Sequence, residues 1–151
     1  MRLRVTNRNV LKADADFICV NIGSKCEAAQ MVSRLKKAFP DVYRGYVSDC
    51  STHDIGILHG HYMVCAIPRT SKYVICLYSL KTQPDGSVKV DLDAFKSALT
   101  SATQSVLIGW QPRYPAPFSV AIEVNSELES EMTEVVKDIC SPLPGTIQIC
   151  I

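Results

Sequence analysis

The chain has 151 residues, a length that fits one compact domain and is too short for two well-packed ones. Hydrophobic residues make up 47% and charged residues 21% of the sequence, which excludes a disordered chain, a collagen-like repeat and a coiled coil. The net charge of +1 argues against a protein that binds duplex DNA mainly by neutralising its phosphates.

From the sequence we expect neither a membrane span nor a secretion signal. No apolar run reaches the roughly 20 residues that cross a bilayer, and residues 1–12 alternate arginine with apolar side chains instead of forming a signal peptide. The cysteines number seven, several lie inside apolar runs, and no two form a C-x-x-C pair. We therefore expect reduced, mostly buried thiols and a cytoplasmic or nuclear location.

Short runs rich in β-branched and aromatic residues alternate with segments of helical periodicity. The expected strands include Leu3 and Val5 and the segments 17–22, 62–67, 73–78, 118–124 and 146–151. The expected helices lie within residues 28–39, 42–47, 92–102 and 128–139. Several strands are apolar on both faces, as in the centre of a covered sheet, with core positions at Ile18, Val64, Ile75 and Val120. This order predicts one domain over residues 1–151, a three-layer α/β/α sandwich with a mixed central sheet.

Local signals mark where three of these helices begin. Ser24 with Glu27, and Ser126 with Glu129, have the S-x-x-E spacing of a capping box, in which each side chain binds an unpaired backbone N–H at the helix start. Asp91 stands where an N-cap would begin the helix at 92–102. We therefore expect side-chain caps at all three positions.

Several phrases, in their order along the chain, carry a resemblance to a known family. They are residues 8–18 (RNVLKADADFI), 35–40 (LKKAFP), 73–83 (YVICLYSLKTQ) and 118–123 (FSVAIE). Together they resemble the macro domain, a fold known for binding ADP-ribose, and especially the branch of the ADP-ribose 1″-phosphate phosphatases and the terminal ADP-ribose glycohydrolase. The resemblance covers nearly the whole chain and implies a macro-like module that binds ADP-ribose or a related nucleotide.

The resemblance also implies a set of site residues. Asn9 matches the family's adenine-binding aspartate, and with Val10 it would form the adenine end of the site. The two ligand loops would supply Asn21, Gly23, Ser24, Lys25, Asn125 and Ser126. Lys81 falls at or within one residue of the lysine that attacks the distal ribose in the glycohydrolase branch, which implies a catalytic role for it. No cofactor and no metal are implied.

Both ligand loops depart from the family pattern. The first has one glycine and the second has none, although glycines let backbone N–H groups approach a diphosphate closely. Glu27 and Glu127 stand where a helix N-terminus would otherwise attract phosphate. We therefore expect ADP-ribose to bind no tighter than about 100 μM, about −5.5 kcal/mol, and replacement of both glutamates by glycine to strengthen binding.

Catalysis stays open at this point. The second loop lacks the aspartate that handles protons in the glycohydrolase branch, and Glu127 or Glu129 would have to replace it. The departures favour weak or no ADP-ribosyl hydrolase activity. The alternative is a degenerate, non-catalytic macro fold that serves as a protein or nucleic-acid interaction module.

Two further groups of residues suggest other ligands. The basic residues Arg2, Arg4, Arg8 and Lys12 could contact a single-stranded nucleic acid, but the aromatic residues are scattered and a nucleic-acid partner is not favoured. A second group, which could bind zinc, comprises Cys50, His53, His59 and His61. It lacks a second compact Cys/His pair, so we predict no metal site.

Overall fold

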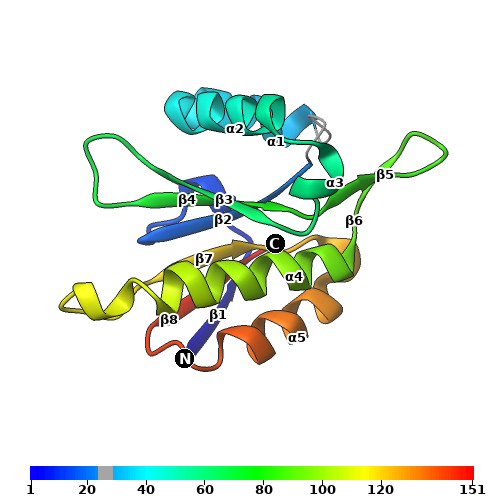
Figure 1. Ribbon diagram of the computed structural model, residues 1–151. Coiled ribbons are helices and arrows are strands. Elements are labelled where there is room, and N and C mark those ends of the chain that lie inside the picture. Colours follow the sequence, from blue (N-terminus) through cyan, green and yellow to red (C-terminus); the bar gives the residue numbers. More distant parts are fainter. Residues whose placement is uncertain (24–28) are drawn as a thin grey trace.

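The structure of the chain, a computed structural model, describes residues 1–23 and 29–151. A six-stranded sheet in the order β1-β8-β7-β2-β4-β3 lies between two layers of helices (Figure 1). The strands are β1 (Arg2–Thr6), β2 (Phe17–Ile22), β3 (Tyr62–Ala66), β4 (Tyr73–Tyr78), β7 (Val120–Glu123) and β8 (Thr146–Cys150). All neighbours are parallel except the antiparallel pair β3 and β4, so the sheet is mixed. This confirms the predicted α/β/α sandwich.

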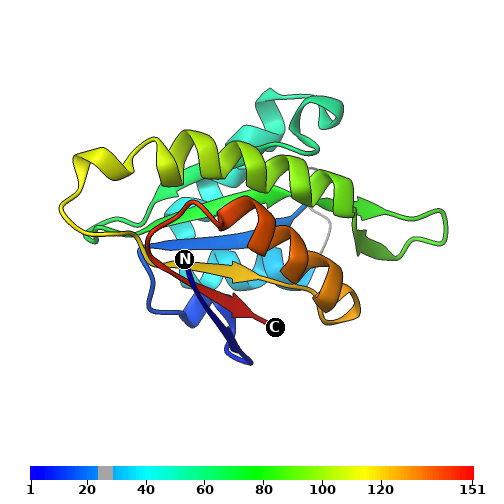
Figure 2. The same ribbon diagram turned by 90° about the horizontal axis from the view of Figure 1, so that it is seen from below.

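Two pairs of long helices cover the sheet. Helices α1 (Ala29–Ala38) and α2 (Pro40–Thr52) pack on one face, and the short helix α3 (Ile55–Leu58) leads from α2 into β3. On the other face, α4 (Leu92–Ala102) and α5 (Glu129–Cys140) lie side by side, as Figure 2 shows. No helix in the described part of the chain is long and apolar enough to span a membrane.

The remaining elements are short. A two-stranded antiparallel hairpin, β5 (Leu80–Thr82) and β6 (Val88–Val90), follows β4 and extends from the end of the sheet (Figure 1). The described residues include the 3-10 turns η1 (Val10–Lys12), η3 (Gln111–Arg113) and η4 (Ser126–Leu128), and the π-helical segment η2 (Thr103–Ile108) extends α4.

The strand alternation divides the core into two halves. In β2, Phe17 and Cys19 belong to the cluster under α4 and α5, whereas Ile18 and Val20 belong to the cluster under α1 and α2. Successive side chains of a strand point to opposite faces, and here both faces are covered by helices. This is the physical reason that all six residues of β2 are apolar or fully buried, as the run FICVNI predicted.

Three of the four predicted core positions are fully buried, and the fourth reflects the position of its strand. Ile18, Ile75 and Val120 are each at most 2% exposed. Val64 is half-buried and packs against the core because β3 is an edge strand of the sheet. The sequence pattern of β3 resembles that of a central strand, and only the strand order shows that β3 is an edge.

Two of the three expected caps lie within the described residues, and their outcomes differ. Asp91 confirms its prediction, because its Oδ1 accepts from the backbone N of Asp93 at 3.1 Å and of Ala94 at 3.3 Å. The capping box of Ser126 and Glu129 is wrong: Asn125 caps the turn η4 instead, and α5 begins at Glu129 without a side-chain cap. The other box, Ser24 with Glu27, lies outside the described residues.

The cysteines that the structure describes are free thiols. Cys19, Cys76, Cys140 and Cys150 are buried, while Cys50 and Cys65 are half-buried. Burial raises the pKa of the Cys140 thiol to about 11 and raises that of Cys19 as well, because a thiolate would lose its hydration. The prediction that most thiols are buried is confirmed for this part of the chain.

Candidate functional site

A cleft of about 610 Å³ opens where the parallel strands β2, β7 and β8 end. Loops at the carboxyl ends of parallel strands enclose the ligand crevice in α/β folds, so this is the expected place for a site. The lining residues come from seven segments: Arg8, Asn9 and Val10 around η1; Asn21; Met31 and Arg34 of α1; Leu80, Val88 and Val90 of the hairpin; Glu123 and Val124; Asn125 and Ser126; and Cys150 and Ile151.

One side of the cleft is formed by the turn η1. Asn9 caps this turn, because its Oδ1 accepts from the backbone N of Leu11 at 3.0 Å, and Val10 is buried beside it. The Asn9 amide oxygen, which matches the family's adenine-binding carboxylate, therefore already has a donor. The structure brings both predicted residues to the cleft and leaves the Asn9 side-chain NH₂ as its available donor.

The loop after β7 also contributes to the wall of the cleft. Asn125 Oδ1 accepts from the backbone N of Glu127 at 2.8 Å, and Ser126 is exposed. Both line the cleft, as the resemblance implied. Glu127 and Glu129 are exposed and follow directly in the chain, but neither is among the lining residues.

A buried polar network joins three strands at the base of the cleft. Ser79 Oγ donates to Asn21 Oδ1 at 2.7 Å, and Asn21 Nδ2 donates to the backbone carbonyl of Glu123 at 2.8 Å. The backbone N of Asn21 donates to Glu123 Oε1 at 3.0 Å. Ser79 and Asn21 are almost completely buried, so the Asn21 amide holds the ends of β2, β4 and β7 together. We predicted Asn21 as a ligand contact, and the structure also gives it this structural role.

Glu123 is a candidate site residue that the sequence reasoning missed. It ends β7, is half-buried and lines the cleft. Burial raises its pKa above the usual value, and the two hydrogen-bond donors of Asn21 and the charge of Arg34 only partly offset this effect. A carboxylate with a shifted pKa in a cleft is a candidate for function. The available signal was a single charged residue at the end of an otherwise apolar strand.

Lys81 lies on the hairpin but not among the residues that line the cleft. It is paired in register with Lys89, and both are exposed. The neighbouring residues Leu80 and Val90, which form the adjacent pair, face the cleft. Since side chains alternate along a strand, Lys81 belongs to the opposite face of the hairpin. The hairpin was not predicted, so its effect on Lys81 could not be foreseen.

The first ligand loop lies only partly within the described residues. Gly23 is buried, and its carbonyl oxygen accepts from the Tyr46 hydroxyl at 2.5 Å. It is not among the lining residues of the cleft. Ser24, Lys25 and Glu27 lie outside the described residues.

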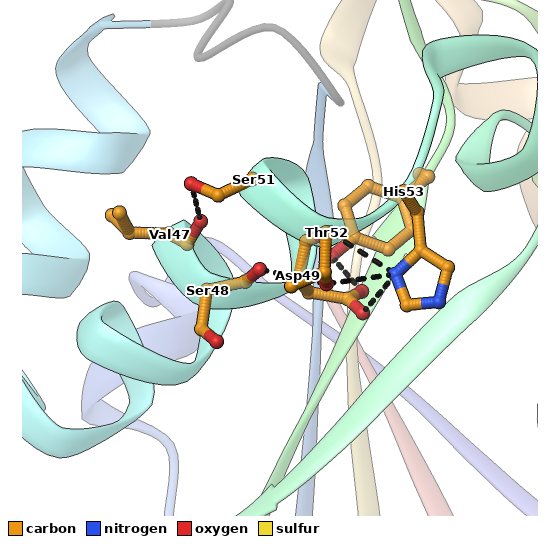
Figure 3. Close-up of polar contacts among 7 residues, drawn as sticks. Val47, Ser48, Asp49, Ser51, Thr52 and His53 are labelled. Atoms are coloured by element: carbon orange, nitrogen blue, oxygen red, sulfur yellow. Dashed lines mark hydrogen bonds and ion pairs between the residues drawn. The ribbon is translucent and has the colours of Figure 1, made fainter.

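In the candidate zinc group of Cys50, His53, His59 and His61, the two histidines His53 and His59 take part in separate contacts. Asp49 binds His53 at the end of α2, with Oδ1 and Nδ1 3.3 Å apart (Figure 3). Asp49 Oδ2 also accepts from the Tyr78 hydroxyl at 2.6 Å. His59 Nε2 lies 2.9 Å from Asp91 Oδ2 at the start of α4. Within residues 1–23 and 29–151, no three His, Cys, Asp or Glu side chains are placed to hold a metal ion.

Comparison with known proteins identifies the fold. A scan against protein-family models and a search of the curated proteins give no match. Among solved structures, the macrodomain of Thermus aquaticus DarG superposes with a TM-score of 0.69 at 17% identity, covering 99% of this chain and 97% of that chain. The chain has a macrodomain fold. The macrodomain of Mycobacterium tuberculosis DarG superposes equally well, with a TM-score of 0.69, the same coverage and 14% identity.

The match confirms the resemblance that the sequence phrases indicated, and the low identity fits a divergent macrodomain. It covers the sheet, both helix layers and the loops that enclose the cleft, because nearly the whole of each chain is superposed. At these identities the likeness establishes the fold, and the function is argued from the cleft itself.

Proposed function

We propose that this macrodomain binds ADP-ribose or a related nucleotide in the cleft at the strand ends. The carrying observation is the cleft itself, with a volume of about 610 Å³ and the predicted residues Asn9, Val10, Asn125 and Ser126 in its walls. Small-molecule sites typically enclose about 300 to 1,000 Å³, so a nucleotide fits. Arg8 and Arg34 line the same cleft and would attract the diphosphate.

Binding is proposed to be weak, for two reasons. Glu127 is exposed and directly follows the cleft residue Ser126, so its carboxylate would repel a diphosphate bound there. Asn9 and Asn125 use their side-chain oxygens to cap backbone turns, which leaves fewer acceptors for a ligand. A dissociation constant no tighter than about 100 μM is therefore expected.

We propose a binding module in preference to a hydrolase. The face of the hairpin that carries Lys81 is opposite to the face that lines the cleft, so its amine is badly placed for attack on a ligand there. If Lys81 is nevertheless catalytic, Lys81→Ala will abolish release of ADP-ribose from an ADP-ribosylated substrate. Unchanged slow release, or none from either protein, fits a module without a catalytic lysine.

A second proposal, an interaction module, rests on the edge strand β1. Arg2 and Arg4 are exposed there, and Val5 is 57% exposed, so the free edge presents apolar and basic side chains together. A protein segment could add to this edge. A nucleic-acid partner remains less favoured because the chain has no strong positive field. The free thiols favour a cytoplasmic or nuclear location, which we retain as a proposal.

Calorimetric titration with ADP-ribose tests the main proposal. The unmodified protein should bind with a dissociation constant of about 100 μM or weaker, and Glu127→Gln should bind about two- to fivefold more tightly because one repulsive charge is removed at a helix start. Glu134→Gln is the matched control, since Glu134 is exposed in α5 further from the cleft. No binding at millimolar ligand would favour the interaction module, and low-micromolar binding would show that the repulsion is overestimated.

A further inference from the structure

We propose that Glu123 is a specificity-determining residue of the cleft, whose carboxylate accepts hydrogen bonds from the hydroxyl groups of a ribose in the bound ligand. The inference rests on the proposed function, because it concerns the ligand of the same cleft. It assigns to Glu123 a positive role in recognition, in addition to its repulsion of phosphate.

The position of Glu123 is fixed before any ligand arrives. Asn21 holds it twice, through the backbone N–H that donates to Oε1 at 3.0 Å and through the side-chain amide that donates to the Glu123 carbonyl at 2.8 Å. Ser79 fixes the Asn21 amide in turn, at 2.7 Å. A carboxylate that is already ordered loses little side-chain entropy on binding, so its hydrogen bonds to a ligand are strengthened.

Glu123 has acceptor capacity that the fold does not use. An ionised carboxylate offers about four acceptor sites, and within the described residues Asn21 is its hydrogen-bond donor. Glu123 lines the cleft, and no buried side-chain oxygen or nitrogen in the described part of the chain lacks a partner. The remaining acceptor sites of Glu123 therefore open to the cleft, where a ligand would meet them.

The charges around Glu123 select the kind of donor that it would accept. Arg34 acts on the carboxylate as a favourable positive charge, and Arg8 lines the same cleft. The positive charges of the two arginines would attract a diphosphate. The Glu123 carboxylate would repel a diphosphate, and it would instead accept hydrogen bonds from an uncharged donor such as a hydroxyl group. A ribose diol supplies two adjacent hydroxyl donors, and acidic side chains recognise ribose hydroxyls in other nucleotide sites. A ligand with both a diphosphate and a ribose therefore complements the cleft, because its phosphates can face the arginines and its hydroxyl groups can face Glu123.

The variant Glu123→Gln tests this role with little change of shape. Its amide oxygen can still accept from the Asn21 backbone N–H, while the second carboxylate oxygen becomes an NH₂ donor. We expect ADP-ribose to bind about tenfold more weakly or worse, since hydrogen bonds to charged groups are the strong ones. If Glu123 only repelled phosphate, the same substitution would strengthen ADP-ribose binding, because it would remove the repulsive charge.

Three ligands separate the two possible sources of the hydroxyls. ADP lacks the distal ribose of ADP-ribose, and 2′-deoxy-ADP also lacks a complete diol on the adenosine ribose. If the substitution weakens ADP-ribose binding alone, Glu123 reads the distal ribose. If it weakens the binding of both ADP-ribose and ADP but not of 2′-deoxy-ADP, Glu123 reads the adenosine ribose. Either pattern supports the inference.

The outcomes distinguish this inference from the proposed function. No binding of ADP-ribose to the unmodified protein overturns both. Normal binding to the unmodified protein, with equal or tighter binding to a folded Glu123→Gln variant, overturns the inference alone. Glu134→Gln serves as the charge-matched control and should bind as the unmodified protein does. If Glu123→Gln does not fold, the ligand series on the unmodified protein decides: equal affinity for all three ligands overturns the inference.

Discussion

The buried network at the base of the cleft makes the variant Ser79→Ala informative. Ser79 is 0% exposed and Asn21 is 4% exposed, and the Ser79 hydroxyl donates to Asn21 Oδ1 at 2.7 Å. The substitution removes this donor and leaves the buried amide oxygen of Asn21 without a hydrogen-bond partner. A buried acceptor left unpaired costs about 1 to 3 kcal/mol. For a domain of this length each kcal/mol lowers the melting temperature by roughly 2 to 4 °C, so a decrease of about 6 °C is expected.

Thermal and urea unfolding at neutral pH measure this effect. Ser130→Ala is the matched control, because Ser130 is exposed in α5 and its loss should change stability by less than about 0.5 kcal/mol. Equal stability of the two variants would show that the Asn21 amide does not depend on Ser79. The account of how β2, β4 and β7 are held together at the cleft would then be wrong.

Three other predictions concern stability and the thiols. Asp91→Ala should cost about 1 kcal/mol by loss of the N-cap, while Asp91→Asn keeps the cap and loses only the charge paired with His59. His59 lowers the Asp91 pKa, so the contribution of the pair is present above the ordinary carboxyl pKa and is lost as pH falls through the lowered value; urea midpoints that show no such pH dependence would contradict this. Gly145→Ala should destabilise by about 3 kcal/mol, because a Cβ would lie 1.9 Å from the Phe118 carbonyl oxygen, whereas Gly56→Ala, with open space around it, should fold normally in the same melting assay. All seven cysteines should react with a thiol reagent in the denatured, unreduced protein, and most should be protected in the native state; a count below seven after denaturation would reveal a disulfide.

The sequence alone determined the fold class and the order of the sheet strands and long helices. The mostly apolar run at 17–22 predicted a central strand, and β2 occupies those residues, because a strand covered on both faces favours apolar side chains on both of its faces. The N-cap at Asp91 was equally readable, since a cap depends on a side chain and the backbone two or three residues away. These signals are local, and the helices and strands that they predict can pack in only a few layered arrangements.

The chemistry of the cleft was decided by the tertiary structure. Glu123 contacts Asn21 from 102 residues away, and Ser79 contacts Asn21 from 58 residues away, so no local pattern joins them. Lys81 matched a family phrase, but the register of an unpredicted hairpin placed it opposite the face that lines the cleft. Strand register and strand order fix which side chains share one surface, and both are set by packing between distant segments.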